Sequence, residues 1–367
     1  MISLYQIKKF TLIGLLIIGN NTMANIDDKV RDVVKKYNIP SLSVMVLSQE
    51  KILVQSSFGV RKSGEDDKIK ETDSFHLGSC GKAFTATLIL KLQDEGKLSV
   101  EDSITKYLKT LDAKKFADIK IKHLLSHTGG IKANVEGGPW GSMFSFDITP
   151  SQGRDIAINF LNTAKRTAKA GSEFIYSNIG YMLLGQIIEK VESRPFEEVL
   201  TTKLFKPFEM NSCSYGPAGR NDNSSQPWAH QFVDGKYIPQ DPKLIGSDNP
   251  PALSPAGGIS CGQGDWAKFI WFVMNVGKNS KYLSPEGRAF ISKVNLDDYT
   301  FGAWGKVSRD WSGILLIHAG SNTLNYSYAI VGLDKKFAFL INTNSPSQEA
   351  VLEMVPFLKE YYINSLQ

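Results

Sequence analysis

Residue patterns typical of β-strands occur at both ends of this 367-residue chain, and the sequence between them has mostly helical patterns. Residues 41–48 (SLSVMVLS) and 52–58 (ILVQSSF) predict a hairpin that turns at residues 49–51. Near the other end, short apolar runs separated by turn residues predict three more strands, at 313–318, 326–331 and 337–342. Strands at both ends with helices between them favour one sheet built from the two termini.

Several helices are predicted around and between these strands. Residues 26–37 repeat apolar side chains at helical spacing, and residues 82–93 (KAFTATLILKLQ) are apolar nearly all round, as in a helix buried at the centre of a molecule. From about 98 to 250 the pattern is mostly helical and irregular, with a Gly- and Pro-rich loop at 132–150. Within this region the clearest helices are expected at 154–162 and 178–192, and an amphipathic helix at 347–362 is expected near the end of the chain.

The fold class predicted from these patterns is α/β (α+β). It would consist of an antiparallel sheet built from N- and C-terminal segments and flanked by helices, with an inserted, mostly helical half. We expect one domain over residues 25–367, with the sheet part at about 25–78 and 250–367 and the helical part at about 79–249. A cleft is expected where the two halves meet.

The first residues have the pattern of an export signal. Lys8 and Lys9 precede an apolar stretch at residues 10–19 (FTLIGLLIIG), and the small residues Thr22 and Ala24 follow it. A membrane-spanning helix needs about 20 apolar residues, so no stable span is expected. We predict a signal peptide at 1–24 and an exported protein, periplasmic or secreted; a short uncleaved anchor is the alternative.

The overall charge is modest and scattered. The chain has a formal net charge of +5, and its lysine pairs are isolated along the sequence. No basic stripe of the kind that binds nucleic acid is present, so we expect no nucleic-acid partner.

The chain has three cysteines, Cys80, Cys213 and Cys261. An odd number gives no disulfide framework, although one bridge is possible and Cys213–Cys261 is the pair to test. Three buried free thiols are the favoured interpretation. Cys80, next to a candidate nucleophile, is expected to be a buried thiol and not the nucleophile itself.

The strongest chemical signal is Ser79-Cys80-Gly81-Lys82. If a helix starts at Ser79, Lys82 lies one turn later on the same face, so that its amine stands beside the hydroxyl. A serine hydroxyl needs a neighbouring base to become a good nucleophile, and a desolvated lysine can supply one. The alternative is an N-cap followed by a surface lysine, but the largely apolar helix after it argues against a freely solvated lysine.

Two further motifs carry groups that suit acyl transfer. Tyr176-Ser177-Asn178 offers a phenol that could move protons and an amide that could hydrogen-bond a substrate amide. Alternatively, Asn178 is a helix N-cap and Tyr176 a core aromatic residue. His318 ends an apolar strand, and Gly320 permits the close backbone approach expected where a substrate lies along an edge strand.

In this order and at these separations, the three motifs resemble those of the serine β-lactamase and penicillin-binding protein superfamily. The closer match is its class C β-lactamase and DD-peptidase branch, which carries S-x-x-K, Y-x-N and K/H-x-G. Residues 123–131 (HLLSHTGGI), 255–260 (PAGGIS) and 301–304 (FGAW) are also similar to family segments. The resemblance covers about residues 26–362 and implies a β-lactamase-like fold with no metal or organic cofactor.

Catalytic roles follow from the resemblance at three positions. Ser79 would be the nucleophile that becomes acylated, and Lys82 would be its activating partner. Tyr176 would be the general base or a proton relay.

Substrate-binding roles follow in the same way. Asn178 would contact a substrate amide, and His318 stands where β-lactamases usually have lysine. Gly320 and Ser321 complete the third motif, and the backbone N–H groups of Ser79 and Ser321 would form the oxyanion hole.

These residues predict an exported serine hydrolase that forms an acyl-enzyme at Ser79. We expect a peptidase acting on D-amino-acid-containing peptides, or an esterase, because a histidine at position 318 lacks the permanent charge that lysine offers a β-lactam carboxylate. The alternatives are a class C-type β-lactamase and a non-catalytic cell-wall-binding protein. The expected partner is a small-molecule or peptide substrate: a peptidoglycan-like peptide, a β-lactam or an ester.

Two other patterns are interpreted as structural. His123 and His127 lie four residues apart, but Leu124 occupies the place of the glutamate in a zinc-binding H-E-x-x-H motif. The Gly-rich run 257–264 lacks the strand–helix context of a nucleotide-binding loop and is read as a turn.

Overall fold

The computed structural model describes residues 26–145, 147–219, 225–276 and 281–365. The predicted signal peptide at 1–24 lies outside these residues. Within them, no helix is both long and apolar enough to cross a bilayer.

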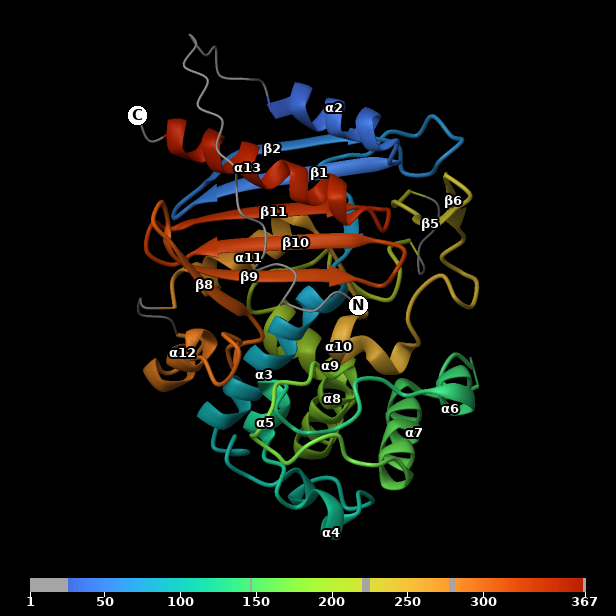
Figure 1. Ribbon diagram of the computed structural model, residues 1–367, viewed down its shortest axis with the longest axis vertical. Helices are drawn as coiled ribbons and strands as arrows, with labels where there is room; N and C mark the ends of the chain where they lie inside the picture. The colour runs from blue at the N-terminus through green and yellow to red at the C-terminus, as the bar shows by residue number, and fades with distance from the viewer. Residues whose placement is uncertain (1–25, 146, 220–224, 277–280, 366–367) are drawn as a thin grey trace.

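A six-stranded antiparallel sheet joins the two ends of the chain, as predicted (Figure 1). Its strand order is β2-β1-β11-β10-β9-β8. The N-terminal hairpin pairs with the C-terminal strands through β1 and β11, with Ser43 opposite Asn342. The five predicted strands are β1 (Ser41–Ser48), β2 (Ile52–Gly59), β9 (Gly313–Ser321), β10 (Tyr326–Gly332) and β11 (Phe337–Thr343).

The central strands of the sheet are buried on both faces, which explains the long apolar runs that they contain. Helices α2 (Ile26–Tyr37) and α13 (Gln348–Asn364) pack on one face, and α11 (Gln263–Met274) packs on the other (Figure 1). In β1, Val44 and Val46 belong to the core beneath α2 and α13. Met45 and Leu47 belong to the larger core shared with the helical half. Successive side chains of a strand point to opposite faces, so this alternation follows directly from the backbone.

The helical half is organised around a buried helix. Helix α3 (Lys82–Asp94) is buried along most of its length, as its apolar sequence predicted, and it packs against α8 (Asn178–Glu192). The other α-helices among the described residues are α4 (Ala113–Phe116), α5 (Ile121–Leu125), α6 (Gly137–Ser142), α7 (Pro150–Thr163), α9 (Phe196–Leu200), α10 (Ser254–Gly257) and α12 (Pro285–Ser292).

Several elements differ from the sequence prediction. The run at 257–264, read as a turn, contains β7 (Ile259–Gly262), the central strand of a second sheet with the order β3-β7-β4. The loop at 132–150 contains the short helix α6, and a β-hairpin interrupts the mostly helical region. These unpredicted strands are short and contain few β-formers: β3 (Ser74–His76), β4 (Ser214–Tyr215), β5 (Ala229–Val233), β6 (Lys236–Gln240) and β8 (Gly305–Arg309).

The cysteines also correct the prediction of three free thiols. Cys213 and Cys261 form a disulfide, and Cys80 is free and buried. Cys213 immediately precedes β4, and Cys261 lies in β7, so strand pairing brings the two side chains together. Only the tertiary pairing of β4 with β7 creates this contact, which is why cysteine spacing did not reveal it.

The disulfide is expected to stabilise the fold measurably. It closes a loop with a sequence separation of 48 residues, and bridges of this kind contribute about 2–4 kcal/mol to the free energy of unfolding. Urea unfolding of the oxidised protein should therefore show a higher midpoint than unfolding under reducing conditions. The Cys213→Ala/Cys261→Ala variant should not respond to the reductant, and coincident curves for oxidised and reduced wild-type protein would contradict the prediction.

Candidate active site

The nucleophile candidate, Ser79, lies on a tight turn between the two sheets and the buried helix. The sequence analysis expected Ser79 to start the α-helix. In the structure it belongs to a 3-10 turn, η1 (Gly78–Gly81), that leads into α3. Side chains three residues apart eclipse each other in a 3-10 turn. Lys82 Nζ therefore lies 3.1 Å from Ser79 Oγ, and the hydroxyl remains partly exposed.

Lys82 is buried among neutral acceptors. Its side chain is inaccessible to solvent, and Nζ donates to Asn178 Oδ1 at 2.8 Å and to the carbonyl oxygen of Ala256 at 2.5 Å. Nζ also lies 4.9 Å from the centre of the Tyr176 ring. Desolvation lowers the pKa of Lys82 from 10.5 to about 7. Near neutral pH a substantial fraction of this amine is therefore unprotonated and able to accept a proton.

Tyr176 and Asn178 enter the same cluster from the start of α8. The Tyr176 ring lies 4.9 Å from Lys82 Nζ and its hydroxyl interacts with Ser79, and burial raises the pKa of the phenol well above 10. Asn178 is not the helix cap, because Ser177 Oγ takes that role by accepting from the N–H of Gly180 at 3.0 Å. The Asn178 side chain is thus available to join Lys82 to the substrate side of the site.

Asn134 is a site residue that the sequence analysis missed. Its Oδ1 accepts from Asn178 Nδ2 at 2.8 Å, which fixes the orientation of the Asn178 amide toward Lys82. Asn134 belongs to the 132–150 segment, and nothing in its spacing to the motifs distinguishes it from other loop asparagines.

The third motif forms an open strand edge beside the nucleophile. Strand β8 pairs with β9 only as far as Ile317, so no described strand covers His318 to Ser321 on that side. A Cβ on Gly320 would lie 2.0 Å from the Leu77 carbonyl oxygen and 2.9 Å from Ser79 N. A Cβ on Gly78 would lie 2.3 Å from Ser321 N. The backbone amides of Ser79 and Ser321 are therefore close neighbours, as an oxyanion hole requires.

His318 is held as a neutral ring at the edge of this cluster. Its side chain packs near Tyr299 and Trp304, with ring centres 6.4 Å and 5.9 Å away. Burial, reinforced by the nearby Lys82, lowers the pKa of His318 from 6.5 to about 3. The imidazole therefore carries no charge at neutral pH.

The remaining chemically reactive side chains near the site have structural contacts. His127 Nδ1 accepts from the N–H of Ser177 at 3.1 Å, and its ring lies 4.1 Å from that of Tyr176. Cys80 Sγ points to the His318 carbonyl at 3.4 Å, and burial raises the pKa of the thiol well above 9. These contacts position Tyr176 and β9, and they leave Cys80 a poor candidate for a thiolate nucleophile.

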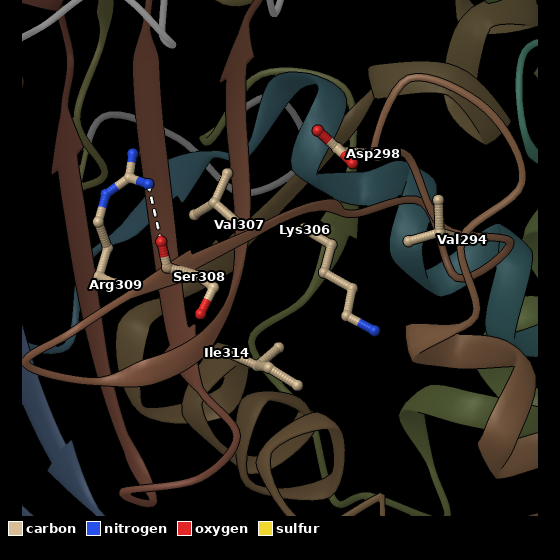
Figure 2. A pocket seen from close by; sticks show the side chains of 7 residues that line it. All are labelled: Val294, Asp298, Lys306, Val307, Ser308, Arg309 and Ile314. Atoms are coloured by element: carbon tan, nitrogen blue, oxygen red, sulfur yellow. Dashed lines mark hydrogen bonds between the residues drawn. The ribbon is translucent and has the colours of Figure 1, made fainter.

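A separate groove runs along the edge of β8 (Figure 2). In the figure the Lys306 side chain extends between Val294 and Ile314, and none of the motif residues lines the groove. Lys306 Nζ donates to the Ser292 carbonyl at 3.1 Å, which anchors the end of α12 to the sheet. We therefore assign this lysine to the packing of α12.

The fold, with a serine–lysine–tyrosine cluster where the sheet meets the helices, defines a class of proteins, the serine hydrolases related to β-lactamases and penicillin-binding proteins. The chain belongs to the Beta-lactamase family, whose family model matches residues 26–353.

Known proteins similar to this chain agree with that assignment. "Protein flp" of Staphylococcus aureus (strain MRSA252) is 25% identical over 361 residues, which span 94% of this chain and 67% of that protein. "Penicillin-binding protein 4*" of Bacillus subtilis (strain 168) is 32% identical over 161 residues, 44% of this chain and 34% of that protein. The structure of an octameric penicillin-binding protein homologue from Pyrococcus abyssi shares the fold with a TM-score of 0.77 and 23% identity, covering 92% of this chain and 78% of that one.

The lowered pKa of Lys82 predicts the pH dependence of serine reactivity. If the neutral amine accepts the Ser79 proton, the labelling rate by a fluorophosphonate probe should rise about tenfold per pH unit below pH 7 and level off above it. A lysine with an ordinary pKa would instead give a rate that keeps rising to about pH 10. Lys91→Ala, on the same helix but without a contact to Ser79, should leave the profile unchanged. A labelling rate that stays constant between about pH 5.5 and about pH 8.5 would contradict proton acceptance by Lys82.

Proposed function

We propose that this protein is an exported serine hydrolase that forms an acyl-enzyme at Ser79. The observation that carries the proposal is the position of Lys82, buried between the Ser79 hydroxyl and the Asn178 amide with its pKa lowered to about 7. Burying a lysine in this way is costly and has no evident structural benefit, whereas it produces the base that serine activation needs.

The reaction follows from the contacts. Ser79 Oγ attacks the substrate carbonyl while its proton passes to Lys82, directly or through the Tyr176 hydroxyl. The carbonyl oxygen becomes an oxyanion, and the closeness of the Ser79 and Ser321 backbone nitrogens supports their N–H groups as the donors that stabilise it. The proton then moves to the leaving group, whose bond to the carbonyl carbon breaks and leaves the acyl-enzyme. Water repeats the same steps and releases the acid.

The substrate class we infer is a D-amino-acid-containing peptide or an ester. An extended substrate can lie along the open edge of β9 at residues 318–321 and pair with its backbone. The similarity to a penicillin-binding protein supports a peptidoglycan-like peptide as acyl donor. Export would bring the protein to such substrates, and the apolar stretch at residues 10–19 supports it.

A β-lactamase is the main rival, and His318 is the reason for ranking it second. The ring is neutral at any pH near 7, so it offers no fixed charge to the carboxylate of a β-lactam. A non-catalytic cell-wall-binding protein is the other rival, but binding alone would not require Ser79 and Lys82 in contact.

Intact-mass measurement after incubation with a penicillin tests the proposal and separates the rivals. A lasting adduct on wild-type protein, absent from Ser79→Ala, is the result expected for a penicillin-binding peptidase. Rapid penicillin hydrolysis without an adduct would instead identify a β-lactamase. Ester hydrolysis without a penicillin adduct or penicillin hydrolysis would identify an esterase. No reaction with penicillin, ester or fluorophosphonate would refute the hydrolase proposal.

His318→Lys should shift selectivity toward β-lactams. A hydrogen bond to a charged group contributes roughly 1.5–3 kcal/mol, which corresponds to about 10–150-fold in kcat/KM for penicillins or cephalosporins. Esters without a carboxylate are the internal control and should gain little. The two substrates should be compared at about pH 8. At that pH most Lys82 amines are neutral and do not repel the ammonium group introduced at position 318. An unchanged β-lactam-to-ester ratio would remove the reason for ranking β-lactamase second.

A further inference from the structure

Asp248 is a buried carboxylate at the end of the loop that follows β6, outside the three motifs. Its side chain is 1% exposed. One oxygen, Oδ1, receives the N–H of Asn249 at 2.7 Å and the side-chain amide of Asn322 at 2.7 Å, and it lies 3.1 Å from His76 Nε2. The other oxygen is buried without a hydrogen-bond partner among the described residues. A carboxylate held out of water at this cost calls for an explanation.

His76 connects this carboxylate to the nucleophile turn. Its Nδ1 accepts the backbone N–H of Gly78 at 3.1 Å, and its Nε2 lies in contact with Asp248 Oδ1, 3.1 Å away, without the alignment of a hydrogen bond. Gly78 is the residue before Ser79; its φ is 52°, and a Cβ on it would lie 2.3 Å from Ser321 N. The imidazole thereby fixes the peptide unit that precedes the Ser79 amide.

Asn322 connects the same carboxylate to the third motif. It follows Ser321 directly, and its Oδ1 accepts the N–H groups of Leu324 at 3.2 Å and Asn325 at 2.9 Å. Its side chain closes the turn after β9, and Asp248 holds the amide end of that side chain in place. Asp248 Oδ1 therefore contacts both His76, which precedes the Ser79 turn, and Asn322, which follows Ser321.

The neighbouring Asn249 extends these contacts to the lysine. Its Nδ2 donates to the Gly257 carbonyl at 3.2 Å, one residue beyond the carbonyl that accepts from Lys82. Asp248 and Asn249 thus hold three separate segments of the site from a loop that contributes no motif.

We propose that Asp248, acting through His76 and Asn322, is the positioning residue that sets the separation of the two oxyanion-hole amides, those of Ser79 and Ser321. The inference rests on the proposed function, since it assigns these amides to oxyanion stabilisation. Asp248 touches neither substrate nor the reacting atoms. Replacing Asp248 should mainly destabilise the transition state, because misplaced N–H donors stabilise the developing negative charge of the oxyanion less well.

The test compares an oxo-ester with the matching thiono-ester, whose sulfur uses an oxyanion hole poorly. Removing one oxyanion donor outright costs about 10²–10³-fold in kcat, so a displaced pair should cost somewhat less. We expect Asp248→Ala to lower kcat/KM for the oxo-ester by about 30-fold to 100-fold and to change the thiono-ester by less than about threefold. Asp248→Asn keeps the shape and an acceptor oxygen, so a loss of about tenfold is expected, mostly in kcat.

Asp241→Asn is the matched control, because it removes the same charge from the same loop where the carboxylate accepts only a local N–H, that of Lys243. It should leave both esters unaffected. Equal losses on the oxo- and thiono-esters of the Asp248 variants would mean a general structural role and would overturn the proposal, as would no loss at all.

Hydrogen–deuterium exchange keeps the proposal testable without turnover. Asp248→Asn should speed exchange in peptides covering residues 76–80 and 319–325, and Asp241→Asn should not. If wild-type protein hydrolyses neither ester, the proposed function fails while this measurement still decides the positioning role. Unchanged exchange in both peptides would overturn it.

Discussion

The site depends on the burial of one amine, that of Lys82. Its partners are the Ser79 hydroxyl, the Asn178 amide and the Ala256 carbonyl, which come from separate parts of the chain. A pKa lowered from 10.5 to about 7 means that folding disfavours the charged amine by roughly 5 kcal/mol. The unfolded chain binds the proton more tightly, so this penalty is fully present below about pH 7, decreases as pH rises from about 7 to 10.5, and is absent above 10.5. The rest of the fold must offset it, which the sheet and the large shared core do.

The partners of Lys82 come from both the sheet and the helices of the molecule. Helix α3 delivers Lys82 into the core, and α8 brings Asn178 to it from the helical half. The segment before β7 supplies the carbonyl, and β7 is paired to the strand that leads into the nucleophile turn. The disulfide between Cys213 and Cys261 ties β4 to that same β7. The groups that contact the Lys82 amine therefore all lie where the sheet meets the helices.

The sequence was informative where local pattern and tertiary role coincide. The apolar runs of β1 and β11 and the all-round apolar helix α3 were predictable, because burial on both faces leaves a continuous apolar signature. The motif residues Ser79 and Lys82 were predictable because three-residue spacing brings them together in any helical turn.

Other parts act through contacts that no local pattern carries. Asn134 and Asp248 are single polar residues in loops, and their importance comes from Asn178 and His76 far away in the sequence. Strand β7 was misread as a turn because a short segment containing glycine is recognisable as a strand only from its partners on both sides. The predicted boundary between sheet part and helical part stays a prediction.

The titratable groups around Ser79 are pushed in opposite directions by the same cause. Burial lowers the pKa of Lys82 toward neutrality and raises that of Tyr176, because desolvation disfavours the ammonium in one case and the phenolate in the other. The resemblance left Tyr176 open as general base or proton relay. A phenol that resists ionisation is a poor resting base, whereas a half-neutral amine at hydrogen-bond distance from the same hydroxyl is a good one. Groups whose environments separate their pKa values in this way usually divide acid and base duties between them. In the proposed mechanism Lys82 is therefore the proton acceptor, and Tyr176 keeps its own proton at rest and acts as a relay.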